Sequence, residues 1–387
     1  MTKKLASIII CIITIGFAAA ACSGGNSLSF YKHTQDSVLL EDREDDYQLN
    51  GVEPLPEPEP NVLEGYTFTS VDLASVLPEE YADKFDPGSI QSACVRIYEE
   101  KLYFNTGALV ENIFQNQILV YDMKTGKLSV FGEKEAFSRH FTTMTGLTID
   151  ENGMMYVIDA ARYRIVRADL EGNVTGEISY ANIADFIGGP KEMTGRTLTL
   201  DSIEVLADGS IYLSSLSIGN EKIGAVFRVD PEKGVVSAAG ENSFGVLSRS
   251  HEPGMVCFIN TQFLLKGRDG SLSQMTAMGL SAMHLVLDGN LKSIQALPHT
   301  YRYLTYQDGA YYLPYSDFDY DTSTVLLTVH VYDSDFKYAG EYLAQDFGLV
   351  DAMDNPIPNF ITPLAFDGAG NMYVINGGTL LIGTKNG

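Results

Sequence analysis

A short pattern of apolar and turn residues recurs along most of this chain and limits the possible folds more than any other feature. Its clearest copy runs from Thr145 to Ser179, TGLTIDENGMMYVIDAARYRIVRADLEGNVTGEIS, and divides into four short apolar runs separated by turns. Asn-Gly and Gly-Asn turns between runs of β-forming residues are typical of β-hairpins. Four such runs joined by short turns predict one four-stranded antiparallel sheet.

The second apolar run of this unit recurs down the chain, at intervals of roughly 40–60 residues. A repeat of this length fits four-stranded blades set around a centre, which is the architecture of a β-propeller. No window shows a sustained period of 3.6 residues, so a helical solenoid is excluded. The copies are KLYFNT from Lys101, MMYVID from Met154, SIYLSS from Ser210, SLSQMT from Ser271, AYYLPY from Ala310 and NMYVIN from Asn371.

The two ends of the repeat region predict how the ring closes. The last copy, NMYVINGGTLLIGTKNG, supplies three strands, while GYTFTSVDL at Gly65–Leu73 is a strand without a repeat of its own. Because closure removes an open sheet edge, we predict that this strand completes the last blade. The alternative is a free N-terminal strand. The predicted fold is therefore an all-β, six-bladed propeller over residues 65–387, with seven blades as the alternative.

The residues before the repeats predict an exported chain. Lys3 and Lys4 precede the apolar run LASIIICIITIGFAAAA, which is short for a bilayer span and ends in small residues just before Cys22. We predict that residues 1–21 are a cleaved leader. Residues 22–64 contain EDREDDYQ and EPLPEPEPN, whose charge repulsion and prolines favour an extended, flexible acidic tether over a folded segment.

Charge and cysteine content exclude some partners. The net charge is -24, and a protein this acidic is repelled by phosphate backbones, so nucleic-acid binding is rejected. Export permits a disulfide, but the repeats place Cys94 and Cys257 in blades that are not adjacent. We expect two buried thiols and a monomeric protein.

The sequence also resembles known families. AAAC at the end of the leader resembles the lipobox of bacterial lipoproteins, and this implies that Cys22 is acylated, for example with palmitate, and becomes the mature N-terminus. GLTIDENGMMYVID and FDGAGNMYVIN resemble NHL-type repeats, and the chain after Gly65 is similar to six-bladed propeller lipoproteins of bacterial cell envelopes. The resemblance implies an extracytoplasmic protein on a bacterial membrane. Such propellers bind proteins, peptides or glycans, and some relatives are metal-dependent lactonases or lyases.

Connection lengths predict which face of the ring carries a site. The turns between the first and second, and the third and fourth, strands of each blade are short, whereas the connections on the opposite face are long. Binding residues concentrate in long loops on a rigid scaffold. The long-loop face is predicted to comprise 107–117, 132–145, 180–198, 215–223, 240–260, 316–324 and 345–361.

Three groups of side chains on that face are candidates. In SDFDYDTS, Asp317, Asp319 and Asp321 alternate as at the opening of a calcium loop, although the turn Gly and the final Glu are missing, and a solvated acidic loop is the alternative. Tyr315 and Tyr320 beside it are candidate ligand contacts, while most neighbouring tyrosines are expected to pack in the core. A cationic cluster able to hold a carboxylate or sulfate is the third, with intramolecular ion pairs as the alternative; it comprises Arg139, His140, Arg162, Arg164 and Arg196.

Catalytic motifs are missing from the sequence. It contains no G-x-S-x-G, no H-E-x-x-H and no phosphate-binding loop, and no pair of histidines has metal-ligand spacing. We therefore favour a binding or scaffolding propeller that engages a protein, peptide or glycan, with no cofactor. The alternative is a metal-dependent hydrolase or lyase with ligands from several blades at the channel mouth.

Overall fold

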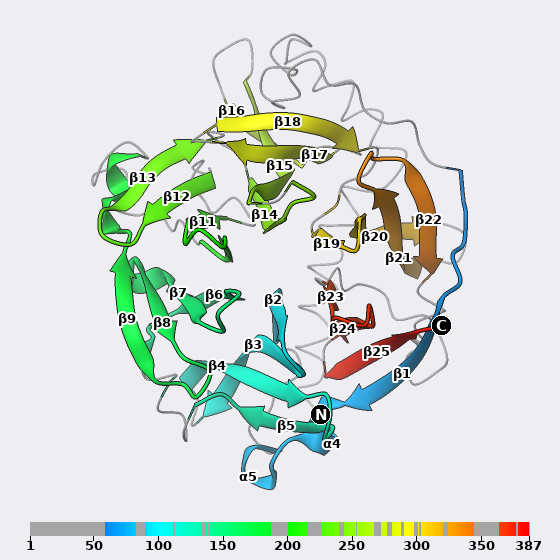
Figure 1. The fold of residues 1–387 in the computed structure, drawn as a ribbon, viewed down its shortest axis with the longest axis horizontal. Helices are drawn as coiled ribbons and strands as arrows, with labels where there is room; N and C mark the ends of the chain where they lie inside the picture. Colours follow the sequence, from blue (N-terminus) through cyan, green and yellow to red (C-terminus); the bar gives the residue numbers. More distant parts are fainter. Residues whose placement is uncertain are drawn as a thin grey trace, which may run out of the picture.

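The chain is a β-propeller with four-stranded antiparallel blades arranged around a common centre (Figure 1). The computed structural model describes residues 59–82, 90–110, 113–132, 137, 140–186, 200–215, 226–239, 244–252, 254–266, 272–276, 281–287, 290–297, 301, 303–319, 324–343, 364–376 and 378–386. Within these residues the strands form six sheets, and the inner strand of each contacts the inner strand of the next around the ring.

The sheets follow one another in chain order, each running from an inner to an outer strand. The first two sheets are β2 (Ile90–Tyr98), β3 (Lys101–Val110), β4 (Ile113–Asp122) and β5 (Lys127–Val130), and β6 (Met144–Ile149), β7 (Met155–Asp159), β8 (Arg164–Ala168) and β9 (Val174–Ser179). The next two are β10 (Ser202–Val205), β11 (Ile211–Ser214), β12 (Val226–Asp230) and β13 (Gly234–Ala239), and β14 (Phe244–Arg249), β15 (Val256–Lys266), β17 (Ser281–Leu287) and β18 (Asn290–Leu297), with β16 (Leu272–Thr276) paired to β15. The last two are β19 (Thr305–Gln307), β20 (Ala310–Asp319), β21 (Thr324–Asp333) and β22 (Tyr338–Leu343), and β23 (Leu364–Phe366), β24 (Met372–Asn376), β25 (Thr379–Lys385) and β1 (Tyr66–Asp72).

Short helices cover parts of the rim and the connections. They are α4 (Leu73–Val76), α5 (Glu79–Ala82) and the 3-10 turns η3 (Ala160–Arg162) and η4 (Ala181–Asp185). Among the described residues, no helix is long and apolar enough to cross a membrane.

The repeated turn has a clear chemical basis. In the turn after β6, Asp150 Oδ1 accepts the backbone N–H groups two and four residues further on, each at 2.9 Å, and Tyr156 donates its hydroxyl to Asp150 Oδ2 at 3.2 Å. Asp367 makes the same contacts after β23, with Tyr373 at 3.0 Å. Both turns contain a Gly at positive φ, which is unstrained only without a Cβ. The repeat pattern thus encodes an aspartate-capped turn and a tyrosine that braces it.

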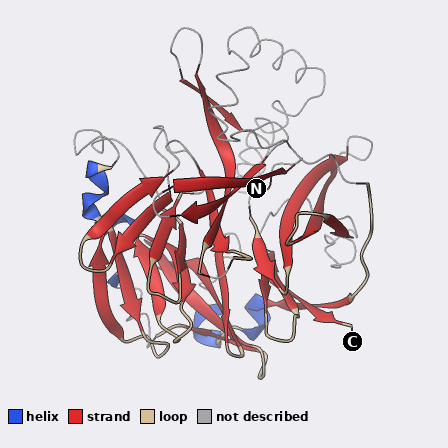
Figure 2. Ribbon diagram, turned by 45° about the horizontal axis from the view of Figure 1, so that its top comes forward, coloured by secondary structure: helices blue, strands red, loops and turns tan. Residues whose placement is uncertain are grey.

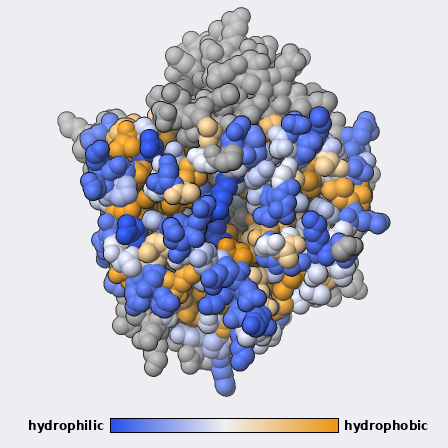
Figure 3. Space-filling model, viewed as in Figure 1, coloured by the Kyte–Doolittle hydropathy of each residue, from blue (hydrophilic) through white to orange (hydrophobic). Residues whose placement is uncertain are grey.

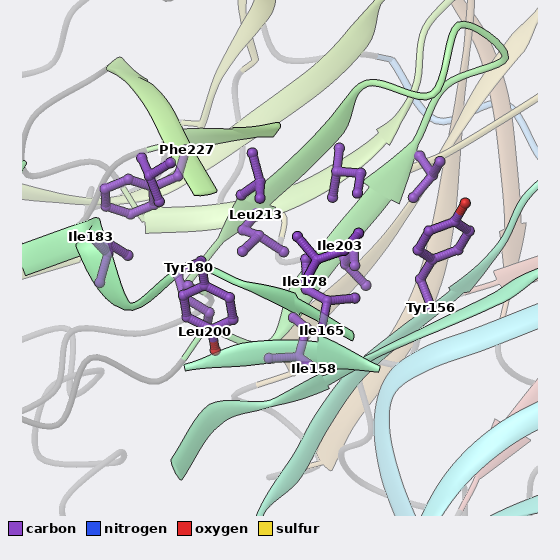
Figure 4. Packing of buried hydrophobic residues seen from close by; sticks show 14 residues of the cluster. Tyr156, Ile158, Ile165, Ile178, Tyr180, Ile183, Leu200, Ile203, Leu213 and Phe227 are labelled. Atoms are coloured by element: carbon purple, nitrogen blue, oxygen red, sulfur yellow. The ribbon is translucent and has the colours of Figure 1, made fainter. Parts of the chain in front are cut away.

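The core lies between adjacent sheets, and both faces of each sheet contribute to it. Along β7, Tyr156 and Ile158 pack against the β10–β13 sheet, whereas Met155 and Val157 pack on the opposite side against the β2–β5 sheet. Figure 4 shows the first of these clusters, in which Ile158 and Ile165 lie close to residues of the neighbouring sheet. Burying each such side chain contributes about 1.5–3 kcal/mol. Burial on two faces explains the near-continuous apolar runs.

The N-terminal strand closes the last sheet, as predicted. β1 pairs antiparallel with β25, with Tyr66 opposite Lys385 and Asp72 opposite Thr379. The outer edge of β25 is therefore paired rather than open.

The residues just before β1 form a second fastening, which we call the strap, Asn61–Leu63. The Glu341 N–H in β22 donates to Asn61 O, and the Leu63 N–H donates to Glu341 O, both at 2.8 Å. A Cβ on Gly340 would lie 2.5 Å from Asn61 O, so only glycine lets the strap approach this closely. The end of the predicted tether thus binds one sheet before β1 joins the next.

One predicted strand assignment is wrong. SLSQMT from Ser271 was expected to be the second strand of its blade, but Leu272–Thr276 pairs only with the far end of β15, opposite Gln262–Lys266. The second strand is the first half of β15, where Val256–Asn260 pairs with β17. The error arises because β15 is long enough to extend beyond the ring into a second hairpin, which produces another turn-then-strand pattern.

Three of the predicted long loops consist mostly of regular strand. β3 and β4 stay paired as far as Val110 opposite Ile113, and β20 and β21 as far as Asp319 opposite Thr324. The predicted connection 240–260 includes the inner strand β14. These paired strands extend beyond the blade length that the repeat predicts, so part of each connection is strand rather than loop.

The expected state of the two cysteines is confirmed. Cys94 and Cys257 are buried and form no disulfide. Burial raises the pKa of the Cys94 thiol to about 11 and that of Cys257 to about 12, so both are protonated at neutral pH.

Candidate functional site

A cavity of about 430 Å³ lies at the centre of the ring. All six inner strands end around it, and Figure 3 shows a hollow near the ring centre where hydrophilic and apolar atoms lie side by side. Ligand sites of small molecules are commonly 300–1,000 Å³ in volume, so the space suits a small organic ligand. Six lining side chains dominate its chemistry: Arg96, Thr148, Glu204, Arg249, Tyr306 and Phe366.

The cavity opens among the short turns. Its lining residues come from the C-terminal ends of the inner strands and from the turns that follow, such as Asp150 and Glu151 after β6. Figure 2 shows these short turns together at one end of the sheets. The cavity therefore lies on the face opposite to the one where the sequence predicts the site.

A carboxylate held between two arginines forms one side of the cavity. The Glu204 side chain is only 5 % exposed, and its Oε2 lies 3.1 Å from Arg96 Nη2 while its Oε1 lies 3.4 Å from Arg249 Nε. A buried carboxylate is stable when it is paired in this way. The three side chains come from β2, β10 and β14, so the group joins three sheets across the centre. We call it the central trio, Arg96–Glu204–Arg249.

The two arginines of the central trio differ in how many donors they use. Arg96 also donates from Nε to Thr148 Oγ1 at 3.2 Å, from Nη1 to Val95 O at 3.1 Å and from Nη2 to Ile203 O at 3.4 Å. Arg249 is 51 % exposed and, within the described part of the chain, donates only through Nε. Arg96 therefore positions Glu204, whereas Arg249 offers two terminal nitrogens to the cavity.

The remaining walls combine two aromatic rings with apolar and polar side chains. Tyr306 lies 4.9 Å from Tyr311, ring centroid to centroid, and Phe366 lies 4.5 Å from Tyr312, so each cavity ring is held by a neighbour. Rings fixed in this way offer apolar area at little further cost in conformational entropy.

The predicted cationic cluster is partly described, and its side chains are paired. Asp159 is fully buried; its Oδ1 accepts the N–H groups of Thr142 and Thr143 at 3.1 Å, and its Oδ2 lies 3.1 Å from Arg164 Nε. Arg164 also bonds to Glu177 and to the backbone oxygen of His140. Burial alone would lower the pKa of Arg164, but the bonds to Glu177 and Asp159 raise it above its usual value.

Arg162 completes this group, which we call the rim cluster, Asp159–Arg162–Arg164. Its Nε lies 3.9 Å from Asp159 Oδ2, and its Nη1 donates to His140 O at 3.2 Å. The intramolecular pairing weighed as the alternative is therefore what the geometry of Arg162 and Arg164 shows. Arg139 and Arg196 lie outside the described residues.

The predicted tyrosine and calcium site lies at the β20–β21 hairpin. Tyr315 is half-buried, with its ring centroid 5.2 Å from that of His330. The backbone of Asp317 and Asp319 belongs to β20, opposite Leu326 and Thr324, so the first half of the expected calcium loop is regular strand. Tyr320 and Asp321 lie outside the described residues. In the described ranges, no three His, Cys, Asp or Glu side chains are grouped to hold a metal.

Sequence reasoning missed the central trio, although a signal was present. Arg96 stands in CVRIY and Glu204 in SIEVL, where a charged residue interrupts an otherwise apolar inner strand. A charge that must be buried has to find a partner, and in a ring of inner strands the partner lies across the centre. Charged residues within the predicted inner strands are therefore the signal that points to Arg96 and Glu204.

Comparisons with known proteins found distant similarity to solved structures. No family model matches the sequence, and neither does any curated protein. Virginiamycin B lyase from Staphylococcus aureus is 10 % identical with a TM-score of 0.46, covering 83 % of this chain and 100 % of that one. A DUF4221 member from Bacteroides vulgatus is 10 % identical with a TM-score of 0.46, covering 84 % and 97 %. A luciferin-regenerating enzyme is 13 % identical with a TM-score of 0.47, covering 79 % and 95 %. At this level of similarity no ligand or activity transfers to this chain.

Proposed function

We propose that this protein is a non-catalytic binding propeller that holds a small ligand in its central cavity. The observation that carries the proposal is the difference within the central trio. Each guanidinium nitrogen of Arg96 is hydrogen-bonded, whereas the terminal nitrogens of Arg249 make no bond among the described residues and lie beside fixed aromatic rings. Rigid donors beside a preformed apolar space are what small-molecule sites share. Each sheet is one blade of a six-bladed, NHL-like ring in this proposal.

We also propose that a lipid on Cys22 anchors the protein to the extracytoplasmic surface of a membrane. Support comes from the sequence: the predicted leader at 1–21, Cys22 directly after it, and the predicted acidic tether that follows. The strap fastens the end of that tether to the rim of the ring at β22. In this arrangement the long-loop face stays available for a protein, peptide or glycan partner of a monomeric propeller.

The cavity proposal is tested by identifying what the protein retains. The full chain is purified from its own cells, and small molecules released on denaturation are measured by mass spectrometry. Ser248→Phe, which places a ring in the cavity, is the matched variant. The proposal expects a compound that accompanies the wild-type chain and is absent from Ser248→Phe. Identical profiles for two equally folded proteins contradict it, and conversion of the compound during incubation would favour an enzyme.

The anchor is tested separately in cells. An alkyne-bearing palmitate should label the full chain, and Cys22→Ala should abolish the label because the acylated thiol is removed. Cys94→Ala is the control, since that thiol is buried and should not affect labelling. Equal labelling of Cys22→Ala and wild type would contradict the anchor.

A further inference from the structure

We propose that the ligand of the central cavity is a small organic monoanion, such as a carboxylate, with an aromatic or apolar body. The inference rests on the proposed binding function and adds the chemical class of the ligand. It depends on three features: the donors of Arg249, the charges around the cavity and the nature of its walls.

Arg249 supplies a suitable pair of donors. It is the last residue of β14, its Nε is held 3.4 Å from Glu204 Oε1, and half of its side chain remains exposed. A guanidinium fixed at Nε still presents two terminal nitrogens, which match the two oxygens of a carboxylate in a bidentate pair. The Nε bond thus sets the orientation of the fork before a ligand arrives, which reduces the entropy lost on binding.

The charged lining residues, Arg96, Arg249, Asp150, Glu151 and Glu204, sum to one negative charge, so an anion is favoured only at the central trio and only with a single charge. Two guanidinium groups and one carboxylate give the central trio a net charge of one positive. Asp150, at the rim, is already engaged by two backbone N–H groups and the Tyr156 hydroxyl, and Glu151 beside it is exposed. With a net charge of -24 on the whole chain, long-range repulsion disfavours ligands with several negative charges.

The walls favour an apolar body. Tyr306 and Phe366 are braced rings, and Ile97 and Leu247 add to the apolar lining. A carboxylate on its own would leave this surface in contact with water. An anion joined to a ring or a short aliphatic chain uses both the Arg249 fork and the apolar wall.

The test compares three probes of nearly equal size by 19F relaxation on the full chain in mild detergent, with detergent alone as the blank. The probes are 4-fluorobenzoate, 4-fluorobenzamide and 4-fluorobenzylamine. The carboxylate should bind most tightly, and Arg249→Gln should weaken it about tenfold while changing the amide less than twofold. Arg249→Lys keeps the charge but loses the pair of terminal nitrogens, so its affinity for 4-fluorobenzoate should lie between those of the wild type and Arg249→Gln.

The outcomes separate this inference from the proposed function. If all three probes bind alike and Ser248→Phe abolishes them together, the cavity binds ligands but the anion class is wrong. If no probe binds, or if binding survives both Ser248→Phe and Arg249→Gln, the inferred ligand class is wrong, and the proposed function is then decided by the compound retained on purification alone. Circular dichroism of each variant shows whether a loss of binding reflects a loss of fold.

Discussion

The rim cluster and the central trio are built from the same parts and differ in what remains unused. Each has a buried carboxylate between two arginines: Asp159 with Arg162 and Arg164, and Glu204 with Arg96 and Arg249. At the rim, both arginines also bond to the backbone oxygen of His140, and Asp159 holds two backbone N–H groups. At the centre, Arg249 keeps its terminal nitrogens for the cavity.

The difference separates a structural group from the proposed binding group. In the rim cluster every nitrogen of the Arg164 guanidinium is bonded within the protein, so a ligand there would have to displace existing bonds. Arg162 is as exposed as Arg249, but its guanidinium is tied at Nη1 to the backbone oxygen of His140 rather than at Nε to a buried carboxylate. In the central trio a ligand adds bonds without removing any. Charge alone did not distinguish the two groups, because both contain exposed arginine.

The largest predicted effect is on the stability of the rim cluster. Asp159→Asn should lower the free energy of unfolding by about 3 kcal/mol, because it leaves Arg164 without its buried counter-charge and presents an amide N–H₂ to it. Chemical denaturation measures the change. Glu177→Gln removes the more exposed partner of Arg164 and should cost less than about 1 kcal/mol. Equal losses would show that Asp159 is not the organising group.

Glu204→Gln should lower stability less than Asp159→Asn does, and it should strengthen the binding of an anionic probe. The free energy of unfolding should fall by about 1–2 kcal/mol, since Arg249 is half exposed and one oxygen of the amide can still accept a bond. Removing the carboxylate leaves two positive charges at the cavity, so 4-fluorobenzoate should bind several-fold more tightly. Weaker binding would show that the orientation set by Glu204 matters more than its charge.

Arg249→Gln sharpens the comparison, because it should change binding while leaving the fold almost intact. An exposed ion pair contributes about 0–1 kcal/mol, so the denaturation midpoint should move little. Arg164→Gln is the matched variant and should do the reverse, with a clear loss of stability and unchanged probe binding. Parallel behaviour of the two variants would remove the distinction between the clusters.

Asp367 is a third carboxylate, and its hydrogen-bond partners are neutral groups rather than arginines. Its substitution has the smallest predicted effect on stability. Burial alone would raise its pKa, but bonds from Asn371 and Tyr373 and from backbone N–H groups hold the pKa below the usual value. Because the folded pKa is the lower one, its stabilisation is present above about pH 4 and is lost as the pH falls through the folded pKa. Asp367→Asn should therefore flatten the acid side of the stability curve, and an unchanged curve would contradict this.

Much of the fold was predictable, because the aspartate-capped turns and two-faced strands leave a local pattern. The turn of Asp150 and the braces from Tyr156 and Tyr373 fall within seven residues of sequence, and the closing strand β1 followed from counting. The site was not predictable in the same way. Arg164 and Arg249 both lie at strand ends, and only the three-dimensional arrangement shows that one has used its donors and the other has not.

The most direct test of the account is a crystal structure of the protein soaked with 4-iodobenzoate, whose iodine is located by anomalous scattering. The account predicts an iodine site inside the central cavity, with the probe carboxylate paired to the terminal nitrogens of Arg249. An iodine site beside Arg162 with an empty central cavity would contradict it and would place binding on the opposite face of the ring.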